Sequence, residues 1–282
     1  MPELPEVEVL VRHLDPQLRG RRILGVEVGR PRVIRPHSPA DLARSLVGRR
    51  IEQVRRRAKY LVFDLENSGE TGPQFILGHL GMTGRMFLQS ADEELPRHAA
   101  VWLTLDQGRW VFEDTRYFGR FHLDSSVLAE LGPEPLAPDF TADRLAAGLE
   151  RFTQPIKVKL LDQTLLAGVG NIYASEALFR AGISPKRAAN RLTRPQVQRL
   201  WASIREVLQE AIQGGSTLPL DFAGAQPGLF YYGLQEGSGS SYEERLRVYD
   251  RLGKPCYHCQ TPIRHLVQAA RSTYFCPRCQ LR

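Results

Sequence analysis

Two pairs of cysteines constrain the fold of this chain more than any other feature. They are the only cysteines among 282 residues, and sixteen residues separate Cys256-x2-Cys259 from Cys276-x2-Cys279. Each pair can bind one tetrahedral ion from a tight turn, and the segment between the pairs is long enough for a hairpin that joins them. Two disulfides are the alternative. We expect a cytoplasmic protein, because nothing in the chain resembles a signal peptide or a membrane-spanning segment. A reducing cytoplasm favours one structural zinc ion (Zn2+) over disulfides.

Basic residues are concentrated towards the C-terminal end of the chain. The 38 Lys and Arg residues and 31 Asp and Glu residues give a formal net charge of +7. Residues 245–282 contain eight basic residues and one acidic residue, Asp250, so this segment alone accounts for the excess. Binding of zinc by four thiolates would leave the segment at about +5. Such a patch favours a polyanionic partner and salt-sensitive binding. A surface that only improves solubility or binds RNA nonspecifically is the alternative.

The pattern of apolar residues predicts a β-rich first half and a helical second half. Apolar residues from Val7 to Leu18 recur at helical spacing, and strand-like runs follow, among them a single run from Val54 to Leu65. This part reads as a sandwich or a barrel. The connector at residues 131–136 begins a region of helical periodicity, and a polar, glycine- and serine-rich loop follows at residues 236–244. We therefore predict three domains, at residues 1–130, 131–235 and 236–282.

The first residues indicate a possible nucleophile. The chain begins Met1-Pro2-Glu3-Leu4-Pro5-Glu6, and removal of Met1 would expose the secondary amine of Pro2 beside a carboxylate. An α-amino group titrates near pH ~8, so an appreciable fraction is neutral at neutral pH and can attack a carbonyl or acetal carbon to form a Schiff base. The alternative is that Pro2 and Pro5 only precede a helix, because proline suits the first turn.

A glycine-rich turn in the second half is typical of an anion site. Gly168-Val169-Gly170-Asn171 leads directly into a helical segment that extends to Phe179. Asn171 can cap this helix, while the glycines let backbone N–H groups approach a phosphate at its positive end. A tight connection without a ligand is the alternative.

In this order, the motifs resemble those of the formamidopyrimidine-DNA glycosylases, bifunctional enzymes of base-excision repair in the helix-two-turn-helix family. The resemblance covers nearly the whole chain. It rests on Pro2 to Glu8, Arg57 to Leu61, His79 to Gly84, Leu131 to Leu136, Leu161 to Gln163, Gly168 to Glu176, and the four cysteines with Arg271 to Phe275. It implies an α+β multidomain fold, with an N-terminal β-sandwich preceded by a helix, a helical helix-two-turn-helix domain and a C-terminal zinc-finger β-hairpin.

The resemblance also implies an activity and assigns residues to it. The enzyme would act as a monomer on double-stranded DNA, located with the nucleoid when bound. It would remove oxidised purines such as 8-oxoguanine and formamidopyrimidines and cleave abasic sites by β,δ-elimination. Pro2 would form the Schiff base and Glu3 would protonate the sugar ring oxygen, supported by Glu6. Lys59 and Arg271 would contact phosphates and assist elimination.

Further DNA contacts are implied by the same motifs. They are Met82, His98, Arg116, Phe118, Lys157 and Asn171. Met82, Arg116 and Phe118 would fill the space that the flipped nucleotide leaves in the duplex.

The chain departs from the family pattern in places that concern DNA contacts. Thr115 and Tyr117 stand in a segment that usually reads Asp-Pro-Arg-Arg-Phe-Gly, and Phe152 stands where a basic residue is expected. The segment 215–247, which closes over the flipped base in relatives, carries an extra residue and an insertion after Gln235. Two alternatives therefore stay open: an endonuclease VIII-like glycosylase for oxidised pyrimidines, and a noncatalytic zinc protein that binds damaged DNA.

Overall fold

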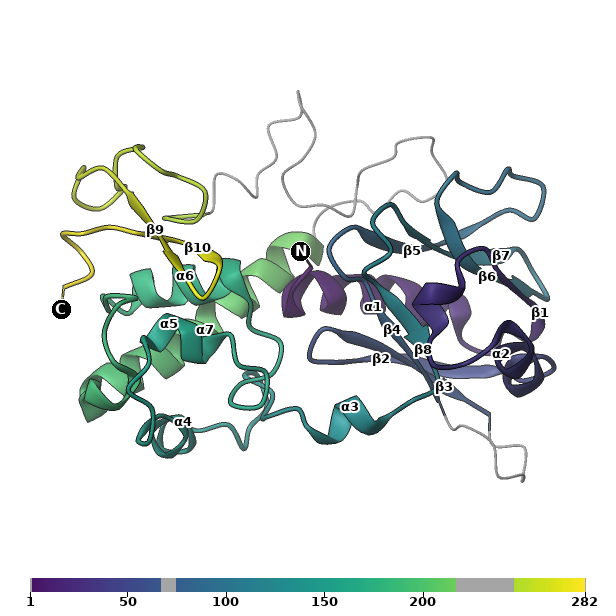
Figure 1. Ribbon diagram of the computed structural model, residues 1–282, viewed down its shortest axis with the longest axis horizontal. Helices are drawn as coiled ribbons and strands as arrows, with labels where there is room; N and C mark the ends of the chain where they lie inside the picture. The colour runs from purple at the N-terminus through teal and green to yellow at the C-terminus, as the bar shows by residue number, and fades with distance from the viewer. Residues whose placement is uncertain (1, 67–74, 217–245, 282) are drawn as a thin grey trace. The chain divides into compact units, whose positions relative to one another are not determined.

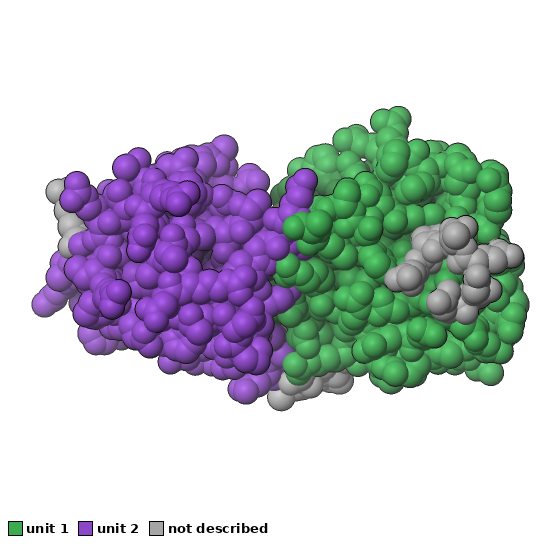
Figure 2. Space-filling view, turned by 90° about the horizontal axis from the view of Figure 1, so that it is seen from below, with its two compact units in different colours: residues 1–129, 215–231 green, residues 130–214, 232–282 purple. Residues whose placement is uncertain are grey.

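The computed structural model describes residues 2–66, 75–216 and 246–281 (Figure 1). The insertion predicted after Gln235 lies outside these residues. Contacts divide the chain into unit 1, residues 1–129 and 215–231, and unit 2, residues 130–214 and 232–282 (Figure 2). The division into three domains stays a prediction. Within the described ranges, no helix has the length and apolar character needed to cross a membrane.

Unit 1 is a β-sandwich with a leading helix, as predicted. Its two antiparallel sheets have the orders β1-β6-β7-β5 and β2-β3-β4-β8. The elements are α1 (Leu4–Leu18), β1 (Ile23–Val28), η1 (Pro31–Ile34), α2 (Pro39–Leu46), β2 (Ile51–Arg57), β3 (Tyr60–Leu65), β4 (Phe75–His79), β5 (Gly84–Gln89), β6 (Ala99–Leu105), β7 (Arg109–Asp114), β8 (Arg120–His122) and α3 (Ser126–Ala129).

The core of unit 1 lies between the two sheets. Trp110 of one sheet contacts Phe63 and Phe121 of the other, with ring centroids 5.4 and 4.9 Å apart, and all three side chains are fully buried. Aromatic burial of this kind contributes a large share of the hydrophobic stabilisation of a sandwich.

The run from Val54 to Leu65 is not one strand, which corrects the sequence-based prediction. It forms β2 and β3, and Ala58 and Lys59 make the turn between them. Ala58 has a φ of +54°, a left-handed conformation that is uncommon for a residue with a Cβ. Tight two-residue hairpins need this conformation, and they usually place glycine or asparagine there.

Unit 2 combines helices with a C-terminal hairpin, again as predicted. Its elements are α4 (Ala142–Leu149), α5 (Ile156–Leu160), α6 (Asn171–Arg180), η2 (Ala189–Arg191), α7 (Arg194–Ser216), β9 (Arg264–Gln268) and β10 (Arg271–Phe275). The apolar side of α7 is buried, including Leu200, Ile204 and Leu208. The segment after β10 contacts the helical part of unit 2, since the Gln280 side chain donates to the carbonyl of Ile183, just after α6, at 3.0 Å.

Candidate functional site

The topology of unit 1 brings the ends of several strands to a single edge. In one sheet, the first residue of β3, Tyr60, pairs with the last residue of β4, His79, which pairs with the first residue of β8, Arg120. In the other sheet, Gly84 at the start of β5 pairs with Asp114 at the end of β7. The turn at residues 80–83 and the loop at residues 115–119 connect the sheets at this edge.

Most predicted site residues of unit 1 fall on this edge. Lys59 lies in the turn before β3, His98 precedes β6, and the connections between the sheets carry the other three. Those three are Met82, Arg116 and Phe118.

Helix α1 brings the N-terminus to the same edge. Its Asp15 carboxylate accepts the Val54 backbone N–H at 2.7 Å, and Glu8, closer to the start of the helix, pairs with Arg56 at 2.8 Å. The helix therefore runs antiparallel to β2, and its first residues lie towards the turn that contains Lys59. Pro2 and Glu3 are accordingly at the end of the sandwich where Lys59 lies, and both are buried.

Glu3 and Glu6 shape the start of this helix. The backbone N–H of Glu3 donates to Oε2 of Glu6 at 2.7 Å, and Pro5 occupies the first turn. Proline suits this position because its nitrogen has no hydrogen left to satisfy. Glu6 thus fixes the backbone of Glu3 at the start of α1.

The side chain of His79, the last residue of β4, contacts both the strand after Lys59 and the turn that carries Met82. Burial, together with the neighbouring charge of Lys59, lowers the pKa of His79 to about 4, so its ring is neutral at neutral pH. Its Nδ1 accepts the backbone N–H of Gly81 at 3.1 Å, and its ring lies 4.8 Å from that of Tyr60. The neutral ring therefore holds the turn beside the strand that follows Lys59.

Met82 and Phe118 are exposed apolar side chains. They are 40% and 43% exposed, and the Arg116 guanidinium lies 4.8 Å from the centroid of the Phe118 ring. Large apolar side chains held at the surface by rigid loops favour contact with another molecule. Met82 and Phe118 thus present two exposed apolar side chains, called the wedges below, and Arg116 adds a cation beside Phe118.

Tyr117, one of the departures from the family pattern, has its own contacts. Its φ is +53°, its hydroxyl lies 3.2 Å from Nδ1 of His98, and the Arg30 guanidinium lies 5.1 Å from its ring centroid. In this chain, therefore, His98 is bonded to the loop that carries Arg116 and Phe118.

In unit 2, Asn171 does not cap its helix through its side chain, which corrects the prediction. Gly170 is the N-cap, and Oδ1 of Asn171 instead accepts a hydrogen bond from Nζ of Lys157 at 2.5 Å. The side chain of Gln163 spans the glycine-rich turn, because it accepts from the Gly168 N–H at 2.9 Å and donates to the Val169 carbonyl at 2.8 Å. The turn before α6 is therefore held in place by hydrogen bonds from the Gln163 side chain.

Lys157 is fully buried, so the direct DNA contact that the resemblance implies for it does not fit this structure. Its ammonium also donates to the Ser272 carbonyl at 2.8 Å and to Oγ1 of Thr273 at 2.9 Å. Lys157 thus joins the side chain of Asn171 to the hairpin strand that begins with Arg271. A buried ammonium needs such partners, since desolvation is otherwise costly.

Arg271 lies at the tip of the hairpin and is exposed. Ala269 and Ala270 form the two-residue turn before it, both with positive φ, and Arg271 pairs with Gln268 across the hairpin. Phe152, the other departure from the family pattern, lies 3.5 Å from Nζ of Lys159, measured to its ring centroid. The ammonium group of Lys159 therefore lies close to position 152, where the family pattern has a basic residue.

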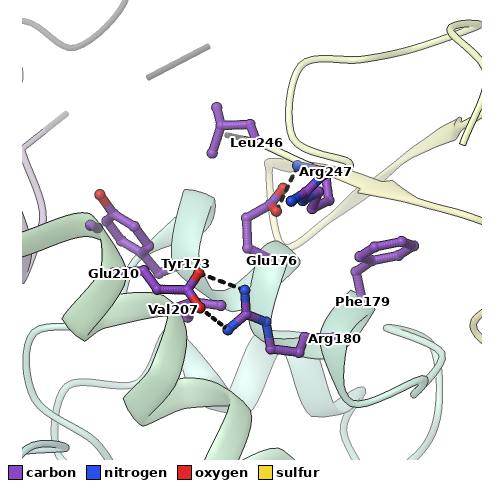
Figure 3. A pocket seen from close by; sticks show the side chains of 9 residues that line it. Tyr173, Glu176, Phe179, Arg180, Val207, Glu210, Leu246 and Arg247 are labelled. Atoms are coloured by element: carbon purple, nitrogen blue, oxygen red, sulfur yellow. Dashed lines mark hydrogen bonds and ion pairs between the residues drawn. The ribbon is translucent and has the colours of Figure 1, made fainter. Parts of the chain in front are cut away.

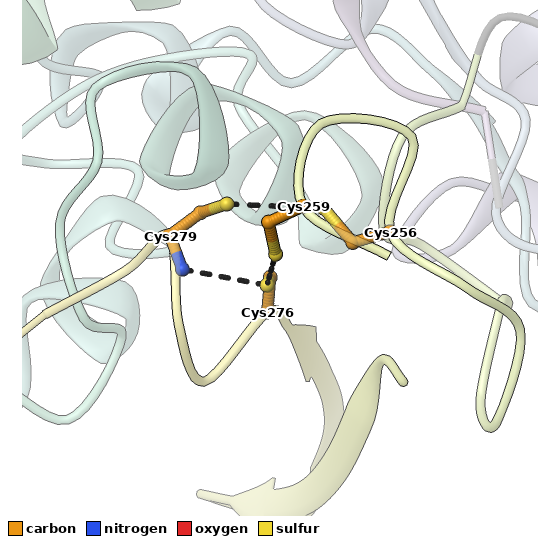
Figure 4. A group of neighbouring side chains, drawn as sticks. All are labelled: Cys256, Cys259, Cys276 and Cys279. Carbon is orange, nitrogen blue, oxygen red and sulfur yellow. Dashed lines mark hydrogen bonds between the residues drawn. The ribbon is translucent and has the colours of Figure 1, made fainter. Parts of the chain in front are cut away.

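The four cysteines form a metal site (Figure 4). Their sulfur atoms all lie within 4.8 Å of one another, with 3.8 Å between those of Cys256 and Cys279 and 3.4 Å between those of Cys259 and Cys276. Four sulfurs at about 2.3 Å from a tetrahedral zinc ion lie about 3.8 Å apart, so the geometry fits one zinc ion. The backbone N–H of Cys279 points to Sγ of Cys276 at 3.4 Å, a contact that favours the thiolate.

Sequence reasoning gave no role to Glu176, which anchors the chain where it enters the hairpin region (Figure 3). Its carboxylate accepts the backbone N–H groups of Arg247, Val248 and Tyr249 at 2.8–2.9 Å. Burial raises the pKa of Glu176, and these three hydrogen bonds oppose that shift. A cavity of about 220 Å³ lies beside it, closed on one side by the Arg180–Glu210 ion pair.

Three family models together match most of the chain. The formamidopyrimidine-DNA glycosylase N-terminal domain matches residues 1–121, the formamidopyrimidine-DNA glycosylase H2TH domain matches residues 131–221, and the zinc finger found in FPG and IleRS matches residues 253–282. The zinc-finger match and the sulfur geometry together identify the four cysteines as the ligands of one structural zinc ion.

Full-length relatives agree with these matches. A formamidopyrimidine-DNA glycosylase of Chloroflexus aurantiacus is 45% identical, with 100% of this chain and 98% of the relative covered. A crystal structure of a Lactococcus lactis FPG mutant with DNA containing Fapy-dG superimposes with a TM-score of 0.85, at 32% identity and with both chains fully covered. A structure of MutM with DNA containing carbocyclic 8-oxo-G gives the same TM-score at 33% identity, again with full coverage. The chain therefore belongs to the formamidopyrimidine-DNA glycosylase family, the DNA glycosylases of base-excision repair.

Proposed function

We propose that this protein removes oxidised purines from double-stranded DNA and then cleaves the strand by β,δ-elimination through a Schiff base at Pro2. The observation that carries the proposal is the convergence of Pro2, Glu3 and Lys59 at one edge of unit 1, beside the loops that hold Met82 and Phe118. A nucleophile, an acid and a cation are then available at the end of the sandwich that also presents the exposed wedges. Two solved relatives support the substrate class, since their structures contain DNA with Fapy-dG and with carbocyclic 8-oxo-G.

The chemistry begins once Met1 has been removed and the damaged nucleotide has been flipped out of the duplex. The nitrogen of Pro2 attacks C1′ of the deoxyribose, and the bond from C1′ to the damaged base breaks. The base leaves with the electron pair of that bond and takes up the proton that the Pro2 nitrogen loses. Glu3 gives its proton to the ring oxygen as the sugar opens. The product is an iminium ion, because a secondary amine that has bonded to carbon has no further proton to lose.

The iminium ion then drives strand cleavage. It withdraws electrons from C1′, so a proton at C2′ becomes acidic, and its loss expels the phosphate on the 3′ side. A second elimination expels the phosphate on the 5′ side, and hydrolysis of the Schiff base restores the amine. Lys59 and Arg271 assist by stabilising the leaving phosphates, and Glu6 holds the backbone of Glu3.

The remaining predicted residues, except the buried Lys157, hold the DNA. Asn171 binds a backbone phosphate at the start of α6, where helix N–H groups favour an anion. Met82 and Phe118 enter the base stack, Arg116 contacts the unpaired cytosine, and His98 lies beside them. Phosphate contacts fix the register of the duplex without reading its sequence, which suits a protein that must find lesions anywhere. The zinc ion is structural and takes no part in a chemical step.

The proposal is tested by borohydride trapping on duplexes that carry 8-oxoguanine opposite cytosine, with the site of the adduct mapped by mass spectrometry. We expect a covalent adduct at Pro2. Pro2→Gly should form the adduct at least about tenfold more slowly, because glycine keeps a terminal amine but its imine loses its charge on deprotonation. A thymine glycol duplex provides the comparison.

An adduct at another residue would contradict the assignment of Pro2. Trapping on thymine glycol alone would contradict the purine assignment and favour oxidised pyrimidines. Tight binding of both duplexes with no adduct, in protein shown to lack Met1, would contradict the enzyme and favour a damage-binding protein.

A further inference from the structure

We propose that Asp114 is a positioning residue for opening the duplex, because its carboxylate holds together the two loops that carry Met82 and Phe118. The inference rests on the proposed function and concerns a residue to which the resemblance assigned no role, although it begins the motif that contains Arg116 and Phe118. Asp114 is the last residue of β7, and it is fully buried.

The carboxylate of Asp114 bonds to both loops at once. Its Oδ1 accepts the hydroxyl of Thr83 at 2.6 Å, and Thr83 is the residue after Met82. The same oxygen accepts the backbone N–H of Arg116 at 3.1 Å, and Oδ2 accepts the backbone N–H of Gly119 at 2.8 Å. These last two donors flank Phe118. The two loops that carry Met82 and Phe118 are therefore hydrogen-bonded to one carboxylate, and Oδ1 accepts from both of them.

A third segment joins the same point. The backbone N–H of Asp114 donates to the carbonyl of His98 at 3.1 Å. The residues just before β5 and β6 and just after β7 are thus connected through Asp114. Since His98 and the Arg116–Phe118 loop are proposed DNA contacts, this residue links the parts of unit 1 that would touch the duplex near the lesion.

Only a carboxylate supplies this set of bonds. A carboxylate is an acceptor at both oxygens, whereas an asparagine would turn an N–H group towards the backbone N–H of either Arg116 or Gly119 and leave two donors facing each other. Hydrogen bonds to a charged, buried acceptor are also stronger than those between neutral groups. The arrangement therefore resists displacement of either loop.

The backbones of the two loops are also in direct contact. Gly81 has a φ of +61°, and a Cβ on it would lie 2.6 Å from the nitrogen of Gly119 and 2.7 Å from the carbonyl carbon of Phe118. The turn at residues 80–83 therefore cannot move closer to the loop at residues 115–119, and the hydrogen bonds of the Asp114 carboxylate keep the two from moving apart. Insertion of apolar wedges into stacked bases is unfavourable, so it requires wedges that do not yield.

Thr83 gives the cleanest test because it can be changed without altering the buried charge. Thr83→Val keeps the shape of the side chain and removes the hydroxyl donor, whereas Thr83→Ser keeps the donor. We expect Thr83→Val to lower single-turnover excision of 8-oxoguanine from duplex DNA by about tenfold, the value of one hydrogen bond to a charged group. Thr83→Ser should keep most of the wild-type rate.

Two further readouts separate positioning from a general structural role. Borohydride trapping at a preformed abasic site needs no base to be withdrawn from the stack, so Thr83→Val should change it by about twofold or less. The fluorescence of 2-aminopurine placed beside the lesion rises when the stack opens, and this rise should be reduced at saturating Thr83→Val. Asp114→Asn should act in the same direction with a larger loss of excision.

The possible outcomes distinguish the two proposals. Wild-type protein that neither excises the base nor forms an adduct would contradict the proposed function, and with it this inference. Active wild-type protein with equal excision by Thr83→Val and Thr83→Ser would contradict the role of Asp114 alone. Equal losses of excision and of abasic-site trapping, with a lowered melting temperature, would reduce Asp114 to a residue that only stabilises the fold.

Discussion

Glu3→Gln should abolish base excision while the protein still cleaves DNA at preformed abasic sites. The substitution keeps the size of the side chain but removes the proton that the sugar ring oxygen needs as it opens. General acid catalysis contributes about 10²- to 10⁴-fold, so we expect the excision rate to fall by at least about a thousandfold. An abasic site already equilibrates with its open aldehyde, which Pro2 can attack without that proton. Single-turnover assays on 8-oxoguanine and abasic duplexes measure the two activities separately.

Glu8→Gln is the matched control for this experiment. Glu8 lies on the same helix, but its carboxylate pairs with Arg56 and Arg12. Partial burial raises the pKa of Glu8, yet these arginines hold it below its usual value, so this residue does not donate a proton at neutral pH. Its substitution should therefore leave excision within a few-fold of wild type. Normal excision by Glu3→Gln would refute the role of Glu3 as the acid.

Cys256→Ser should release the zinc ion and unfold the C-terminal hairpin, with a loss of DNA affinity. The buried apolar cluster of this region contains only Val248, Ile263, Cys256 and Cys276 among the described residues. So small a core cannot keep the hairpin folded without the metal, because structural zinc sites supply folding free energy themselves. Arg271 at the tip then loses its position. We expect zinc content to fall from one ion per chain to none, and the Kd for lesion duplexes to rise at least about tenfold.

His258→Ala is the control for the zinc site. His258 lies 3.5 Å from the sulfur of Cys279 but is not part of the four-sulfur set, so its removal should leave the zinc content unchanged. Zinc content is measured by elemental analysis and DNA affinity by fluorescence anisotropy. Full zinc occupancy and unaltered affinity in Cys256→Ser would show that the hairpin does not depend on this ligand.

Local patterns in the sequence predicted the metal site and the sandwich because each depends on spacing along the chain. The cysteine pairs lie at fixed offsets in the sequence, and the strands of the sandwich follow from short runs of apolar residues. The break between β2 and β3 could not be predicted in this way. Its turn contains Ala58 and Lys59, and neither residue type marks a left-handed conformation.

Local sequence patterns also did not predict roles that depend on partners far away in the sequence. The side chain of Asn171 bonds to Lys157, fourteen positions earlier, and the fold brings these two residues together where Lys157 is buried. Asp114 matches the first residue of the family pattern Asp-Pro-Arg-Arg-Phe-Gly, but the pattern does not reveal its partner Thr83, which is thirty-one positions away. Glu176 likewise acquires its role through backbone groups seventy-one to seventy-three positions away.

The contact between Gly81 and Gly119 sets a limit on how this protein can be engineered or can diverge. Any side chain at Gly81 would meet the backbone of the other loop, and one at Gly119 would lie 2.5 Å from the Phe112 ring. Libraries that aim to change lesion preference can therefore randomise Met82, Arg116 and Phe118 but should hold both glycines fixed. Functional variants would then differ at Met82, Arg116 and Phe118, the side chains proposed to contact the base stack. The spacing between the two loops, set by Gly81 and Gly119, would stay the same.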